Sequence, residues 1–249
     1  MNTCITDFGK FRIQLDDTNI NVGGKNFCVN IAISEKETTL YWLKTEEGGC
    51  ELNGKDIRSN DTIKMTDLAF SILRKHHPER NKWITLMDDS GFTWRDRKRT
   101  YKTNFLKGYL LIHGKTWYED KFNAVMCDED SYRIYMKRKE NFNNPDKKPE
   151  YFDFKNNELT ELYKDSKTWR EFIDKFIAKY DKDKYKMMYE WYRSAIYVIF
   201  EGMEINQYWK IDISNRQNIE CKQNGRQNGG RKSRKKYHRL EPFSWNPVL

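Results

Sequence analysis

The sequence has no long apolar stretch. Its longest apolar runs are short, such as residues 195–200, whereas a membrane-spanning helix needs about 20 mostly apolar residues in a row. Residues 1–8 also lack the basic region followed by an apolar region that marks a secretory signal. We therefore expect an intracellular, cytoplasmic protein that is not secreted and has no membrane span.

Cysteines are few and follow no ligand pattern. The five are Cys4, Cys28, Cys50, Cys127 and Cys221, an odd number without a C-x-x-C pair. Structural zinc sites use closely spaced ligands, and disulfide frameworks use even sets of cysteines in short secreted chains. The spacing therefore argues against both, and it predicts a reducing cytosol and no metal ion.

Apolar residues are scarce, at 37% of the chain, but aromatic residues reach 15%. Disordered chains are poor in aromatic residues, so we expect most of this chain to fold around a core of Tyr, Phe and Trp. The 249 residues allow one large domain or two small ones.

Positive charge is concentrated near the end of the sequence. Residues 216–239 contain nine Lys or Arg and one Glu, so they carry +8 of the net charge of +9. Such a run predicts contact with a polyanion, either nucleic acid or an acidic protein surface, or a localisation signal. The alternative is a solvated tail that keeps the protein soluble. The residues predicted to bind the polyanion are Arg226, Arg231, Lys232, Arg234, Lys235, Lys236 and Arg239.

The last ten residues, 240–249, differ from the basic run before them. They contain Phe243 and Trp245 beside two prolines. We expect this peptide to dock as an extended segment, with Phe243 and Trp245 as anchors, on the same protein or on a partner protein.

Periodicity divides the chain into three parts. Alternating or apolar runs predict strands at 11–15, 27–33, 38–43, 83–87, 132–136 and 208–213, and helical stripes predict helices at 66–77, 106–122, 159–180 and 185–200. Thr66 is the expected N-cap of the first helix. We therefore predict an α/β domain at 1–140, a helical extension with a closing strand at 150–213, and a basic flexible tail at 214–249.

Two segments carry a family resemblance. Residues 83–94 and 109–122 resemble the second half of a GNAT-type acetyltransferase. The motif Gly-Lys-Thr-Trp-Tyr-Glu at 114–119 is similar to a motif in such proteins from large DNA viruses. The resemblance implies a mixed sheet flanked by helices, with a helix whose N-terminus binds the pyrophosphate of coenzyme A. It also implies that Tyr118 is the general acid that protonates the departing thiolate. The alternative is that Trp117 and Tyr118 are core aromatics.

The sequence departs from the family at the expected pyrophosphate loop. Residues 58–66 contain no glycine, so side chains would block the approach of phosphates to the backbone, and Asp61 would repel them. Only Arg58 and Lys64 could help to hold the cofactor. We therefore expect a non-catalytic binding or structural protein with the acetyltransferase fold and no cofactor, of viral origin and associated with the virion, which uses its tail as a contact. The alternative is an acetyl-CoA-dependent N-acetyltransferase.

Overall fold

The computed structural model describes most of the chain before the basic tail. The described residues are 2–7, 9–24, 26–43, 51–52, 55–56, 59–80, 82–87, 91–96, 99–205, 208–220 and 222–223. Arg58 and the tail residues predicted to bind a polyanion or a partner lie outside these ranges, so their roles stay predictions.

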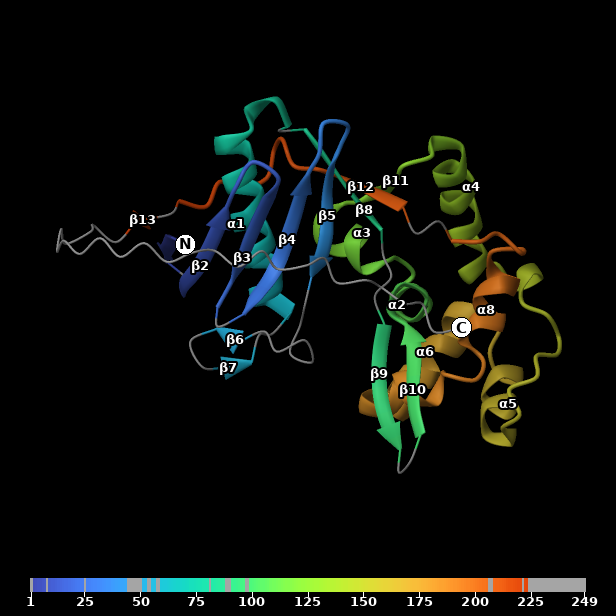
Figure 1. Ribbon diagram of the computed structural model, residues 1–249. Coiled ribbons are helices and arrows are strands. Elements are labelled where there is room, and N and C mark those ends of the chain that lie inside the picture. Colours follow the sequence, from blue (N-terminus) through green and yellow to red (C-terminus); the bar gives the residue numbers. More distant parts are fainter. Residues whose placement is uncertain are drawn as a thin grey trace, which may run out of the picture.

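A nine-stranded mixed sheet forms one side of the molecule, and most of the helices lie on the other (Figure 1). Its strands, in spatial order, are β11 (Val125–Met126), β12 (Tyr208–Asp212), β8 (Trp83–Met87), β5 (Thr38–Leu43), β4 (Phe27–Ile33), β3 (Asn19–Gly23), β2 (Gly9–Leu15), β1 (Asn2–Thr6) and β13 (Lys222–Gln223). Neighbours are antiparallel except β5 and β8, which run parallel. Two small hairpins accompany the sheet, β6 (Glu51–Leu52) with β7 (Lys55–Asp56) and β9 (Gly91–Asp96) with β10 (Arg99–Asn104). The predicted mixed α/β class is confirmed at this level.

Alternation along the strands buries one face of the sheet. Phe11 and Ile13 of β2 and Ile20 and Val22 of β3 are buried, whereas residues between them are partly or fully exposed. Helix α1 (Ser59–His76) packs against β3 and β4 on the buried side and lies behind the sheet in Figure 1. Because parallel strands need a long crossover, α1 also supplies the connection from β5 to β8.

Helix α1 begins earlier than the sequence predicts. It starts at Ser59, so Thr66 is not an N-cap but lies in the third turn, where its hydroxyl donates to the carbonyl of Thr62 at 2.8 Å. Both threonines are fully buried, and the bond to the preceding turn satisfies the Thr66 hydroxyl inside the helix. The predicted strands at 11–15, 27–33, 38–43, 83–87 and 208–213 are confirmed, apart from shifts of a few residues at their ends.

The predicted strand at 132–136 is wrong, because it lies within helix α4 (Glu129–Lys139). Asp128 caps this helix, and Tyr135 is its buried residue. The helix predicted at 106–122 is two helices, α2 (Phe105–His113) and α3 (Trp117–Phe122). Gly114 ends α2 at a φ of 69°, a left-handed conformation that glycine adopts without strain.

The other two predicted helices are also interrupted. Residues 159–180 form α5 (Asn157–Lys164) and α6 (Trp169–Tyr180), and residues 185–200 form α7 (Lys184–Met187) and α8 (Tyr192–Ile199). Short 3-10 helices complete this region, at η2 (Pro78–Arg80), η3 (Glu140–Phe142), η4 (Pro145–Lys147) and η5 (Asp181–Asp183). Helices α4 to α8 all lie in the chain between β11 and β12, which pair directly with each other. The predicted domain boundaries stay a prediction, but β12 belongs to the main sheet.

Aromatic side chains build the core of the helical region, as the composition predicts. Trp169 is fully buried and meets the rings of Phe152, Tyr163 and Phe172 at centroid distances of 5.2, 5.2 and 6.2 Å. These residues belong to the same continuous cluster of buried side chains as the residues that pack against the sheet. The helices and the sheet therefore share one core.

The cysteines differ from the expectation. Cys4 in β1 and Cys28 in β4 are disulfide-bonded, so the argument against disulfides is wrong for these two. Strands β2 and β3 lie between β1 and β4 in the sheet, so Cys4 and Cys28 are not bonded to each other and each belongs to a separate disulfide. Within the described ranges, Cys127 is a free thiol, no helix is long and apolar enough to span a membrane, and no cluster of three His, Cys, Asp or Glu could hold a metal ion.

Candidate functional site

The parallel strands β5 and β8 are paired over a short distance only. Thr39 pairs with Thr85 and Leu40 with Leu86, and β5 then runs on to Leu43. The Thr85 hydroxyl ties the paired part together, since it lies 3.2 Å from the Thr39 hydroxyl and from the Thr38 carbonyl oxygen. Ligands of α/β proteins commonly bind outside the carboxyl ends of parallel strands. The carboxyl end of this pair is therefore the first candidate site.

The start of α1 changes the interpretation of residues 58–66. Because residues 59–66 are helical, they do not form the expected phosphate loop. The helix N-terminus lies at Ser59, with Asp61 in its first turn, and Lys64 is exposed in the second turn. Backbone N–H groups at Ser59 and the positive end of the helix dipole are suited to an anion, as is the ammonium of Lys64.

Tyr118, the predicted general acid, lies in α3 and is 9% exposed. Its ring meets the edge of Trp117 at 5.1 Å, and its carbonyl accepts from the N–H of Ala124 at 3.2 Å. Helix α3 ends at Asn123, whose φ of 53° gives the left-handed turn that leads into β11. Tyr118 is therefore held rigidly within the core rather than on a loop.

Glu119 is the best-connected polar residue near Tyr118, and sequence reasoning missed it. Its side chain accepts from the N–H of Thr116 at 2.7 Å, the hydroxyl of Tyr135 at 2.5 Å and the ammonium of Lys139 at 3.0 Å. Burial first, and then the neighbouring Glu119, raise the pKa of Tyr135 well above its usual value. The Thr116–Glu119 capping box was visible as T-x-x-E, but the contact with α4 was not.

The next residue, Asp120, holds a second cluster. It accepts from Tyr109 at 2.9 Å and from Lys121 at 2.6 Å, and it also forms an ion pair with Lys115. Bonds from these two lysines hold the pKa of Asp120 well below its usual range. Tyr109 also stacks on His113, with ring centroids 4.0 Å apart. Because α4 holds Glu119 and Tyr109 of α2 holds Asp120, both residues fix α3 in place.

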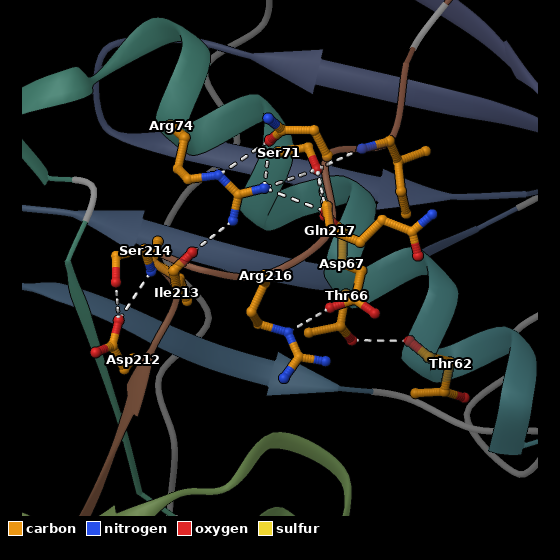
Figure 2. Close-up of polar contacts among 12 residues, drawn as sticks. Thr62, Thr66, Asp67, Ser71, Arg74, Asp212, Ile213, Ser214, Arg216 and Gln217 are labelled. Carbon is orange, nitrogen blue, oxygen red and sulfur yellow. Dashed lines mark hydrogen bonds and ion pairs between the residues drawn. The ribbon is translucent and has the colours of Figure 1, made fainter.

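A third cluster attaches residues 213–219, at the start of the predicted tail, to α1 (Figure 2). Arg74 donates to the carbonyls of Ile213 at 2.6 Å and Gln217 at 3.2 Å, and to the side chain of Asn218. Arg216 forms an ion pair of 2.6 Å with Asp67. We call the contacts of Arg74, Arg216, Asp67, Ser71 and the segment 213–219 the α1 clamp.

The α1 clamp includes a surface cleft of about 590 Å³, lined in part by Ser71, Arg74 and Glu220. Arg216 also lies over the ring of Phe122 in α3 at 4.8 Å. The clamp therefore joins α1, α3 and the last described segment. The sequence placed Arg216 in the basic tail, whereas the structure makes it part of the folded body.

Comparison with known proteins identifies no relative. No family model, no curated protein and no solved structure matches the chain.

Proposed function

We propose that the chain has the acetyltransferase fold of the GNAT type and is an acetyl-CoA-dependent N-acetyltransferase. The order of elements is the observation that carries the proposal. Strand β5, helix α1 and strand β8 form a parallel crossover, and α3 and the antiparallel pair β11–β12 follow. The resemblance implies a helix, a strand, a second helix with a tight turn and a hairpin, and α1, β8 and α3 follow one another in that order. The place of the hairpin is taken by β11 and β12, which pair although α4 to α8 separate them in the chain.

The start of α1 removes the strongest argument against a cofactor. The glycine-free stretch that would exclude phosphates is helical from Ser59 onward, so it is not the phosphate loop. The N-terminus of the 18-residue helix α1 and the exposed Lys64 one turn further on would hold the phosphates of coenzyme A, against the repulsion of the Asp61 carboxylate in the first turn. Bound acetyl-CoA would supply an acetyl group as a reactive thioester.

Tyr118 is the residue that we assign as the proton donor. Its position in α3 is fixed from both sides, by the Glu119 contacts with Tyr135 and Lys139 and by the packing of Phe122 against Phe70 at 5.9 Å. A general acid must be held within hydrogen-bond reach of the group it protonates, and rigid packing serves that purpose.

Titration calorimetry with acetyl-CoA tests this function directly. We expect a dissociation constant in the micromolar range, together with acetylation of amine substrates. Tyr118→Phe should retain binding and lose about 100-fold or more of the turnover, because general acid catalysis is typically worth that much. No heat of binding up to millimolar acetyl-CoA would contradict the proposal.

The charge of residues 216–239 favours a second candidate function. In this second function the protein is a non-catalytic scaffold, for example a virion protein, and its tail contacts nucleic acid or an acidic partner. Deletion of 224–249 removes seven of the nine basic residues and leaves Arg216 in the α1 clamp. If the tail binds duplex DNA, the deletion should abolish binding, and the full chain should show a log–log salt slope of about −6. Equal binding by both chains would exclude this function.

A further inference from the structure

Three large apolar side chains lie at one level across adjacent strands of the sheet. Met87 of β8 pairs with Tyr208 of β12, and Tyr41 of β5 follows the pairing of Leu40 with Leu86. Their exposed fractions are 66% for Tyr41, 49% for Met87 and 58% for Tyr208. We call these three residues the apolar row.

The apolar row lies on the face of the sheet opposite to the helices. On β8 the buried residues are Ile84 and Leu86, so Met87 points the other way. Helices α3 and α4 join α1 on the buried side, since Phe122 meets Phe70 and Tyr135 meets Trp209. Figure 1 accordingly shows α1 on one side of strands β2 to β4.

Basic and polar side chains surround the row. On the same face Trp83 is 40% exposed, and the ammonium groups of Lys82 and Lys210 lie 5.8 and 5.3 Å from its ring. On the next strand, β4, Asn30 is buried and donates to Asn21 of β3 at 2.8 Å. An apolar surface of this kind commonly marks an interaction site. Its chemistry suits a short apolar peptide with a negative charge.

We propose that residues 240–249 of the same chain dock on the apolar row. This peptide offers Phe243 and Trp245 to the row, and Glu241 to Lys82 and Lys210. The peptide's other apolar residues are Leu240, Val248 and Leu249, and its prolines are Pro242 and Pro247. Proline favours an extended backbone and has no N–H, so the peptide is suited to lie on a face of the sheet rather than to pair at an edge.

The length of the intervening chain allows this docking. The described chain ends at Gln223 in β13, and β8 lies six strands away in the order of the sheet. At about 4.8 Å between strands, the distance is about 29 Å. Residues 224–239 can span about 55 Å when fully extended, and as a flexible coil they have a root-mean-square length of about 22 Å.

Because residues 240–249 are tethered to the folded chain, even a weak contact is enough to keep them on the apolar row. A flexible linker of this length holds the peptide at an effective concentration of about 1 mM. An intrinsic dissociation constant of about 0.1 mM would then keep the row occupied about nine-tenths of the time. The docking requires no coenzyme A, so it is independent of the function proposed above.

Hydroxyl-radical footprinting of the full chain tests the proposal. The double variant F243S/W245S should raise the oxidation rates of Met87 and Tyr208 at least threefold. Tyr151 and Tyr197 are 70% and 67% exposed elsewhere in the fold, so their rates should stay constant and serve as internal references.

The matched control is S244A/N246S, which changes the same peptide but keeps its anchors, and it should behave as the unmodified chain. Equal rates at Met87 and Tyr208 in all three proteins would overturn the proposal. Protection that disappears on tenfold dilution would also overturn it, because the peptide would then come from a second copy.

Discussion

Replacement of Arg74 by methionine should release the last described segment from the fold. The change keeps most of the apolar stem and removes the guanidinium that holds the segment 213–219 on α1. Its hydrogen bonds reach Ile213, Gln217, Asn218 and Ser71 (Figure 2).

The contacts set the magnitude. A hydrogen bond in a folded protein contributes about 1 kcal/mol net, and one from a charged group contributes about 1.5 to 3 kcal/mol. Gln217 and Asn218 are exposed, so we count their bonds at the lower value, and we count the half-buried bond to the Ile213 carbonyl at about 1.5 kcal/mol. Arg74→Met should therefore lower the free energy of unfolding by about 3.5 kcal/mol.

Urea denaturation followed by circular dichroism measures this change. With a slope of about 3 kcal/mol per molar urea for a chain of this size, the midpoint should fall by about 1 M. Arg133→Met is the matched control, because Arg133 is 79% exposed and has one ion pair with an equally exposed Asp130. The control should lose at most about 0.5 kcal/mol. If Arg74→Met lowers the free energy of unfolding by no more than this control does, the reasoning is refuted.

Three further outcomes are expected. Trp169→Ala should lower the free energy of unfolding by about 3 to 5 kcal/mol, against less than about 1 kcal/mol for the exposed Trp83→Ala, as urea midpoints would show. Burial raises the pKa of Tyr185 to about 12. Above pH 10 this tyrosine therefore ionises in the unfolded chain before it ionises in the folded one, and the free energy of unfolding falls as pH rises. Tyr185→Phe should therefore reduce the loss between pH 8 and pH 11 by about 1 kcal/mol, and an unchanged loss would contradict this. Finally, because Cys4 and Cys28 belong to two separate disulfides, iodoacetamide should label at most one of the five cysteines before reduction, and a second label in the mass spectrum would contradict this.

The strands of the main sheet could be predicted because their burial leaves a pattern in the sequence. Alternation at 11–15 reflects burial of one face of β2, whereas the apolar run at 27–33 reflects burial of residues 28–31 on both faces of β4. The same signal misled at 132–136, where Tyr132, Ile134 and Met136 alternate like a strand. There the Asp128 cap starts a helix, and Tyr135 is the residue that enters the core.

The candidate site was harder to predict than the strands. Tyr118 could be predicted as a candidate from the local sequence motif, but its surroundings depend on contacts between distant segments. Glu119 meets Tyr135 only because α4 folds back on α3, and Arg74 meets Ile213 across 139 positions of the chain. No local pattern encodes such pairs. The start of α1 was missed for another reason, since Thr66 has the residue type of a cap but donates within the helix.

The insertion of α4 to α8 between β11 and β12 has a consequence for synthesis of the chain. Strand β12 is the neighbour of β8 on the side away from β5, and it follows β8 by more than 100 positions. At about 5 to 20 residues per second, a ribosome would make β8 several seconds before its second neighbour exists. During that time β8 is an edge strand with unpaired backbone groups, which can pair with other chains. The helical insertion therefore sets how long the growing protein is exposed to aggregation.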